Sequence, residues 1–274
     1  LVSARDYVSW GSSAEVRGAY QHTLVEELAY LEERGLAGEP VVLSTVYPGP
    51  AHDASIALVA VGQDSVGYRW IDARNGLLIP QNAAYAVIPS STPLHPAFTN
   101  YLRLVETISL QPDDLDPQFS LYELRNGGDG QKPMADFGSA VNLLDAQWLA
   151  ATVHPGEAAE LLTMWQVTNP ENVGPDHPPA FEPDTVFFTH LLAADGGIFS
   201  QHDALDAPSW SWQSGDILLQ IHRLDIATDL PTGSYQPLIG IYDRQTGERL
   251  SLYNSSGPTT ETVIPAPLLE VAKT

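Results

Sequence analysis

Two histidines and two aspartates lie close together in the segment FFTHLLAADGGIFSQHDAL, residues 187–205. His190, His202 and Asp203 are residue types that ligate zinc or transfer protons in catalysis. The same segment contains Asp195-Gly196, which is a strong signal for a two-residue hairpin turn. Whether the segment is a metal site or a plain hairpin therefore depends on how its two strands pair.

The two turn lengths predict different arrangements of the histidines. A two-residue turn places His190 opposite Gln201 and His202 opposite Thr189, so the imidazoles project from opposite faces of the sheet. A three-residue Asp-Gly-Gly loop places the two histidines opposite one another, with Asp203 as a third ligand. We favour histidines that are satisfied by neighbouring groups in a hairpin, and we predict no metal site.

Two tryptophans are spaced for a possible sugar contact in APSWSWQSG, where Trp210 and Trp212 are two residues apart. In an extended segment both indoles project from one face. Exposed indole faces stack on the apolar faces of pyranose rings, so the pair is a candidate glycan-binding platform. The alternative is that both rings seal the edge of a hydrophobic core.

A second candidate site follows the expected strands of the first hundred residues. Tyr47, His52, Asp53, Asp72 and Arg74 come after two of these strands. Ligands of α/β folds bind at the carboxyl ends of the strands, so these side chains could line a polar crevice. Arg74 could hold a carboxylate or phosphate there. The alternative, which we favour, is that Asp72 and Arg74 brace a turn.

Several classes of chemistry are excluded by composition and motif. The chain has no cysteine, so thiolate metal sites, disulfides and cysteine nucleophiles are ruled out. It also lacks G-x-S-x-G, H-E-x-x-H, a P-loop, and a G-x-G-x-x-G after a strand. We interpret the acidic run at 113–116 as a solvated linker and not as a calcium loop. The patterns assign no catalytic residue and no cofactor.

The charge of the chain limits its partners. The formal net charge is -22, and the only lysines are Lys132 and Lys273. Such a surface repels phosphate backbones, so we expect no nucleic acid partner. The most apolar run is far shorter than the roughly 20 residues of a spanning helix. Because the chain begins at Leu1 and not at methionine, we expect it to be part of a longer protein.

The first hundred residues predict a small βαβ unit. A helix is expected over 12–35, capped by Ser12 or Ser13, with a buried stripe formed by Val16, Tyr20, Leu24, Leu28 and Leu31. A second, short helix is expected at 52–62. Strands are expected at 40–47, 68–73, 77–80 and 84–89.

The remainder predicts an all-β domain. We expect a linker over 101–118, with a bridging helix at 99–110, and a jelly-roll-like β-sandwich over 119–274. About nine short strands punctuated by Gly and Pro, among them 158–167 and 185–194, support the sandwich. The predicted fold is thus α/β plus all-β, with the α/β domain over 1–100. A helix of more than a few turns beyond residue 119 would contradict this.

Three stretches carry a resemblance to a known family: YRWIDARNGLLIP, VFFTHLLAADGGIFSQHDA and LPTGSYQPLIGIYDRQTGERL. They resemble the soluble tail of bacterial family-39 membrane glycosyltransferases, which are relatives of the dolichyl-phosphate-mannose–protein mannosyltransferases. In that family a multi-spanning membrane part carries catalysis, so no catalytic residue can be assigned to this chain.

The resemblance implies a non-catalytic accessory region at the extracytoplasmic face of the cell membrane. Its partners would be the membrane-embedded remainder of its own chain and a glycan or protein acceptor. We expect no sugar transfer by this region alone. The alternative is a stand-alone secreted hydrolase that acts on glycans or esters through the crevice of the α/β domain. A hydrolase would need a nucleophile or acid beside a base that a third group orients.

Overall fold

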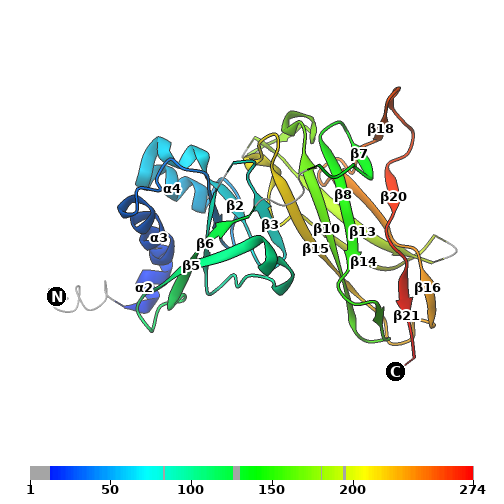
Figure 1. The fold of residues 1–274 in the computed structure, drawn as a ribbon, viewed down its shortest axis with the longest axis horizontal. Coiled ribbons are helices and arrows are strands. Elements are labelled where there is room, and N and C mark those ends of the chain that lie inside the picture. The colour runs from blue at the N-terminus through cyan, green and yellow to red at the C-terminus, as the bar shows by residue number, and fades with distance from the viewer. Residues whose placement is uncertain (1–12, 83, 126–129, 180, 194–195, 274) are drawn as a thin grey trace. The chain divides into compact units, whose positions relative to one another are not determined.

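The structure is a computed structural model in which residues 13–82, 84–125, 130–179, 181–193 and 196–273 are described. The fold is rich in β-strands and forms several sheets (Figure 1). Contacts divide the chain into two compact units. The first unit comprises residues 1–74 and 82–125, and the second comprises 75–81 and 126–274.

The first unit contains a five-stranded sheet in the order β2-β1-β4-β6-β5. Strand β1 pairs in parallel with β2 and β4, whereas β6 pairs antiparallel with β4 and β5. All four residues of β1 are buried, which explains its continuous apolar run. The strands are β1 (Val41–Ser44), β2 (Arg69–Ile71), β4 (Tyr85–Pro89), β5 (Leu102–Ser109) and β6 (Gln118–Leu124).

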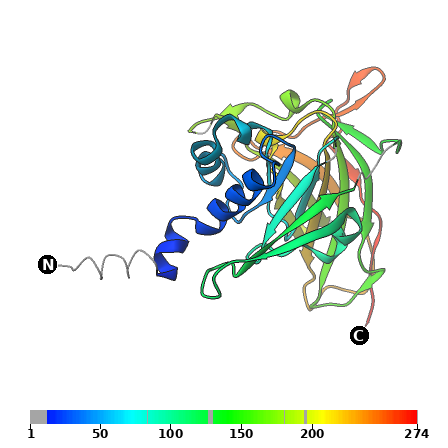
Figure 2. The same cartoon turned by 60° about the vertical axis from the view of Figure 1, so that its left-hand side comes forward.

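Helices α2 (Ala14–Ala19), α3 (His22–Glu33) and α4 (Asp53–Val61) lie on one side of this sheet in both views (Figures 1 and 2). The Ser13 side chain caps α2 by accepting a hydrogen bond from the Val16 backbone N–H at 3.4 Å. None of the helices in the described part of the chain is long and apolar enough to cross a bilayer.

The predicted single helix over 12–35 is interrupted. Gln21 adopts a left-handed conformation with φ 53°, and it separates α2 from α3. Leu24, Leu28 and Leu31 are buried as predicted, but Tyr20 is 70% exposed. The prediction for Tyr20 was wrong because the break rotates the α2 residues out of register with the buried face of α3.

The predicted linker over 101–118 was also wrong. Residues 102–109 form β5, which pairs with β6 along its length, so the expected bridging helix is a strand. In β5 only Leu102 is buried, and the strand lies at the edge of the sheet. A bulge between Leu104 and Glu106 interrupts the alternation that normally marks a strand.

Residues 75–81 interrupt the first unit in the sequence but belong to the second unit, to which they contribute one strand. Strand β3 (Gly76–Ile79) pairs antiparallel with β15, so the boundary differs from the one predicted at residue 100. Gly76 lies against Asp206: a Cβ added at Gly76 would be 2.7 Å from the Asp206 Cβ and 2.9 Å from its carbonyl carbon. The glycine is therefore required by this close approach.

The second unit contains a seven-stranded sheet, a four-stranded sheet and two smaller sheets. Their orders are β19-β18-β7-β8-β10-β15-β3, β14-β13-β17-β20, β16-β21-β9 and β11-β12. Besides β3, the strands are β7 (Ala135–Phe137), β8 (Val141–Trp148), β9 (Thr152–Val153), β10 (Ala158–Val167), β11 (Asp176–His177), β12 (Glu182–Pro183), β13 (Thr185–Leu192), β14 (Ile198–Ala204), β15 (Ile217–Asp225), β16 (Gly233–Tyr235), β17 (Leu238–Asp243), β18 (Leu252–Asn254), β19 (Gly257–Pro258), β20 (Val263–Pro265) and β21 (Leu269–Val271).

Beyond residue 119, the described residues form strands and short 3₁₀ turns but no α-helix, as predicted. These turns are η3 (Pro170–Asn172) and η4 (Ser209–Ser211), and the first unit has two more, η1 (Gly62–Gly67) and η2 (Pro96–Tyr101). The strands expected from the sequence at 158–167 and 185–194 correspond to β10 and β13.

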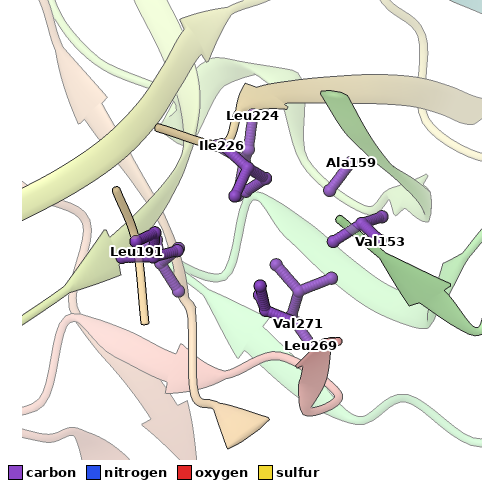
Figure 3. Close-up of a cluster of buried hydrophobic side chains, with 8 residues drawn as sticks. Val153, Ala159, Leu191, Leu224, Ile226, Leu269 and Val271 are labelled. Atoms are coloured by element: carbon purple, nitrogen blue, oxygen red, sulfur yellow. The ribbon is translucent and has the colours of Figure 1, made fainter. Parts of the chain in front are cut away.

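Side chains of the seven-stranded sheet pack against those of the four-stranded sheet. The Trp165 ring on β10 lies 4.4 Å from the Phe187 ring on β13, measured between centroids. Figure 3 shows a second cluster, in which Leu191 of β13, Leu224 of β15 and Val271 of β21 converge. This second cluster therefore joins three sheets.

We predict that Gly76→Ala destabilises the protein by about 1–3 kcal/mol, because the added methyl group must displace Asp206. Urea unfolding would measure the loss. Gly18→Ala is the matched control: Gly18 lies in α2 with no atom within 4 Å of an added Cβ, and alanine there should be neutral or stabilise by about 0.5–1 kcal/mol. Equal effects of the two substitutions would contradict the close approach.

Candidate functional site

The histidine pair of the 187–205 segment does not form a site. His190 pairs with Gln201 and Thr189 pairs with His202, which is the register predicted for a two-residue turn. The imidazoles therefore project from opposite faces of the sheet. His190 Nε2 contacts Asp203 Oδ1 at 2.8 Å, on the face away from His202. Asp195 itself lies outside the described residues.

On the other face, His202 packs against His222 of β15 between the two sheets. Their ring centroids are 5.5 Å apart with perpendicular planes. The His222 Nε2 contacts the Thr163 hydroxyl at 3.2 Å. Burial, together with the neighbouring His202, lowers the pKa of His222 to about 3. His222 is thus a neutral core residue near physiological pH.

We predict that His222 makes the fold sensitive to acid. Its pKa is about 3 in the folded state and about 6.5 when unfolded, so between these pH values only the unfolded state binds the proton. Stability should therefore fall by up to about 1.4 kcal/mol per pH unit as the pH drops through this window.

Urea unfolding between pH 7 and pH 4.5 would measure this. The free energy of unfolding of His222→Gln should change less with pH than that of the wild type. His154→Gln, at a half-buried position outside this pair, serves as the control. A dependence unchanged by His222→Gln would contradict the assignment.

In the first unit, polar groups lie where β1, β2 and β4 end, but of the five residues predicted for a crevice only Asp53 lines a cavity there. The Ser44 hydroxyl donates to Thr92 Oγ1 at 2.7 Å and accepts from the Ala73 N–H at 3.0 Å. The Thr45 N–H donates to the Ile71 carbonyl at 2.8 Å. These bonds join the segments that follow the three strands, and they position polar groups at one edge of the sheet.

Asp53, at the first turn of α4, contacts His52, another predicted residue, and Thr45, which was not predicted. Its two carboxylate oxygens contact the Thr45 hydroxyl and His52 Nδ1. Tyr47 is exposed, and its ring centroid lies 4.8 Å from that of His52. In acyl-transfer triads the imidazole stands between hydroxyl and carboxylate. Here the carboxylate occupies the middle position, so His52 is not placed to activate the Thr45 hydroxyl.

Asp72 and Arg74 brace a turn, which is the alternative that we favoured. The Arg74 Nε donates to Asp72 Oδ1 at 2.9 Å, and Nη2 donates to Oδ2 at 2.6 Å. The Arg74 backbone N–H also donates to Oδ1, at 3.1 Å. The guanidinium fork is thus engaged by its neighbour, and neither residue lines the cavity described next.

Sequence reasoning missed the residue at the centre of this region, Glu27 of α3. Glu27 is 2% exposed and lines a cavity of ≈ 60 Å³ with Asp53 and Asp116. Its Oε1 is buried without a hydrogen-bond partner among the described residues. Burial raises the pKa of Glu27 well above its ordinary value, and Asp116 and Asp53 raise it further. A signal existed: Glu27 lies three residues after Leu24 and four before Leu31, on the buried helix face.

The acidic run at 113–116 is not the solvated linker that we predicted. Asp113 is exposed, but the side chain of Asp114 is only 3% exposed and Asp116 is buried. Arg17 binds both Asp113, at 2.7 Å, and Asp114, at 2.5 Å. The Ser91 N–H donates to Asp116 at 2.5 Å. The run is therefore held in place within the first unit by specific contacts.

We predict that Glu27→Gln stabilises the protein near neutral pH by about 1 kcal/mol or more, since it removes the cost of a buried carboxyl group. The folded pKa of Glu27 is raised, so its wild-type contribution is most favourable below the unfolded pKa and is lost as pH rises through the folded pKa. The stability gap between the variant and the wild type should thus be small at pH 4 and grow toward pH 7.

Chemical unfolding at the two pH values would measure the gap, with Glu32→Gln on the exposed face of α3 as the control. A gap that narrows as the pH rises would contradict the burial cost.

The predicted platform of Trp210 and Trp212 does not exist. Trp212 is 5% exposed, its Nε1 donates to the Ala207 carbonyl at 2.7 Å, and its ring lies 5.9 Å from that of Phe187. Trp210 is half-buried in η4. The 3₁₀ turn explains the difference, because residues two apart share a face only in extended backbone.

Trp210 nevertheless lines a pocket of ≈ 360 Å³ in the second unit. Phe181, which is 73% exposed, contributes a second aromatic ring. Three carboxylates also line it: Glu171, Asp176 and Glu182. Burial, with help from Asp184 and Asp176, raises the pKa of Glu182. The pocket therefore combines apolar ring surface with several hydrogen-bonding oxygens.

The walls of this pocket are anchored to the larger sheets. Strands β11 and β12 form a short hairpin, and His177 Nε2 of β11 contacts Asp243 Oδ2 of β17 at 2.6 Å. Asp243 also accepts from the Thr246 N–H at 2.8 Å, within the DRQTGERL motif. Burial alone would raise the pKa of Asp243, but the bonds from Thr246 and His177 lower it. The buried Trp212 ring also lines the pocket.

In the described part of the chain, no three His, Asp or Glu side chains are grouped closely enough to hold a metal ion.

Comparisons with known proteins give little further guidance. No protein-family model matches the sequence, and no curated protein matches it. Among solved structures, the crystal structure of the C-terminal domain of Wzt is similar over 54% of this chain and 81% of that chain. The sequence identity is 14% and the TM-score is 0.31. A likeness of this size carries no argument about the function of this chain.

Proposed function

We propose that this chain is a non-catalytic, extracytoplasmic accessory region of a membrane glycosyltransferase, and that its second unit binds a glycan or glycosylated acceptor. The observation that carries the binding proposal is the pocket in which Trp210 and Phe181 lie beside the carboxylates of Glu171, Asp176 and Glu182. The link to a glycosyltransferase rests on the sequence resemblance of the three strand-and-turn motifs.

The pocket suits a sugar on chemical grounds. Its volume of ≈ 360 Å³ lies at the low end of the range for small-molecule sites, about 300–1,000 Å³. An aromatic ring covers the apolar C–H face of a pyranose, while carboxylate oxygens accept hydrogen bonds from its hydroxyl groups. Glu182 Oε2 is buried without a partner among the described residues, so a sugar hydroxyl would satisfy it.

We further propose that the second unit is a jelly-roll-like β-sandwich and that the first is built around a βαβ unit. The packing of Trp165 on Phe187 across two sheets supports the sandwich. The parallel pairing of β1 with β2, which α4 separates in the chain, supports the βαβ unit. In this arrangement the glycan pocket lies in loops and short strands outside the two large sheets, where binding residues are common.

The hydrolase alternative receives weaker support. The first-unit crevice holds a hydroxyl, a carboxylate and an imidazole, but Asp53 stands between Thr45 and His52. This order does not provide the imidazole-activated hydroxyl of acyl transfer. The ≈ 60 Å³ cavity beside Glu27 is also far below the size of a typical small-molecule site.

We predict weak glycan binding, with a dissociation constant on the order of 1 mM, as expected for an open pocket with few stacked rings. Ligand-observed NMR with maltotriose, mannotriose and chitotriose would detect it. Trp210→Ala and Glu182→Gln should each weaken binding about tenfold, the loss of roughly one good contact. Because Trp210 is only half-buried, its replacement should change the melting temperature little.

Phe199→Ala is the matched control for this experiment, because Phe199 is an exposed aromatic residue of β14 that does not line the pocket. It should leave glycan binding unchanged. Binding that is equally reduced by Phe199→Ala, or no binding of any of the three sugars, would contradict the proposed site.

We also predict that the chain alone neither transfers nor hydrolyses sugars. Purified protein would be incubated with a polyprenyl-phosphate sugar and peptide acceptors, and separately with the three oligosaccharides and with p-nitrophenyl acetate. No product above the buffer blank is expected. Turnover that is abolished by substituting one residue of this chain, such as Asp53→Asn, would overturn the non-catalytic assignment and favour the hydrolase.

A further inference from the structure

The carboxyl group of Glu27, which lines the cavity of the first unit, is buried in an unusual way. Leaving a carboxyl oxygen buried without a hydrogen bond costs free energy, and a native fold retains such a group mainly where it serves a function. Glu27 Oε1 is in this position, on the helix face that otherwise buries Leu24, Leu28 and Leu31. The glycan pocket is in the other unit, so this cavity requires a separate explanation.

The charges around the cavity favour a cationic occupant. Four carboxylates line it, from Glu27, Asp53, Asp114 and Asp116. Among the described lining residues, the one Lys or Arg side chain is Arg17, and it is engaged by Asp113 and Asp114. His22 Nε2 lies 3.9 Å from the Asp114 carboxylate. Glu27, Asp53 and Asp116 therefore form an acidic group that no lining Lys or Arg neutralises.

The spacing of the carboxylates indicates the kind of cation. Asp116 and Asp53 are close enough to Glu27 for their charges to interact with it. Yet no three His, Asp or Glu side chains among the described residues, these included, are close enough together to ligate one metal ion. Metal–oxygen ligand distances are about 2.0–2.6 Å, whereas an ammonium nitrogen stands about 2.7–2.9 Å from its acceptors. An ammonium group therefore fits a wider arrangement than a bare metal ion does.

The size and access of the cavity agree with a small group. A volume of ≈ 60 Å³ leaves room for only a few water-sized groups, since one water needs about 10–15 Å³ of such space. Leu115, which also lines the cavity, is 76% exposed, so the cavity reaches the surface of the unit. A terminal –CH₂–NH₃⁺ group could enter while the rest of the molecule stayed outside.

We propose that this cavity binds the primary ammonium group of a small amine, with the carboxylates of Glu27, Asp53 and Asp116 as its acceptors. The ammonium would supply the hydrogen bond that Glu27 Oε1 lacks. An amino sugar and the side chain of lysine both carry this group, so the chemistry is shared and the source is a question for experiment. Binding here is independent of glycan binding in the second unit.

The test uses the whole chain and ethylammonium chloride as the probe. A dissociation constant on the order of 1 mM is expected for so small a ligand. Ethylammonium should raise the melting temperature more than tetramethylammonium chloride at the same concentration, because the tetramethyl ion has no N–H to donate. Glucosamine and lysine form two further arms, and the one with the larger effect identifies the source of the amine.

Glu27→Gln should weaken ethylammonium binding at least tenfold, measured by ligand-observed NMR. This variant removes a buried carboxyl group and is expected to fold well, so lost binding cannot reflect unfolding. Glu32→Gln, the same substitution on the exposed face of α3, should bind as the wild type does. Trp210→Ala should also bind ethylammonium normally, which separates this site from the glycan pocket.

Three results would overturn the proposal. The first is an equal response to ethylammonium and tetramethylammonium. The second is unchanged ethylammonium binding by Glu27→Gln. The third is a selective response to magnesium or calcium chloride in place of the amine, which would make the cavity a site for a hydrated metal ion.

Discussion

The pairing of β13 with β14 is the constraint on which the second unit depends. With Thr189 opposite His202, the side chains of Phe187, Thr189 and Leu191 face the seven-stranded sheet. Side chains alternate along a strand, so a slip of one residue would exchange these groups with Phe188 and His190 on the other face. The contact between Trp165 and Phe187 would then be lost, and with it the packing that joins the two sheets.

The same register connects the core to the pocket beside Trp210. Phe187 contacts Trp165 on one side and Trp212 on another. Trp212 in turn forms part of the pocket wall beside Trp210. The two tryptophans therefore have different roles. Trp212 anchors the η4 turn to the core, and Trp210 lines the pocket.

The sequence predicted the long strands well but the polar interior poorly. Strand β10 was predicted with its boundaries, because its run of mostly apolar residues lies between a Gly and an Asn that mark turns. Strand β5 was mistaken for a helix because it is an exposed edge strand with a bulge, so its burial does not alternate. Glu27 was overlooked because a charged residue is normally assigned to the solvent face of a helix. Asp116 was overlooked because its burial depends on Ser91, which is distant in the sequence.

Strand β3 has a consequence for how the protein is made. It precedes its partner β15 by more than half the length of the chain, yet it completes one edge of the seven-stranded sheet. During synthesis, β3 leaves the ribosome on the order of 10 s before β15 at typical elongation rates. Throughout that interval its apolar residues Leu77, Leu78 and Ile79 lack their native partner strand. The nascent chain therefore passes through a stage in which this segment is open to mispairing or to capture by a chaperone.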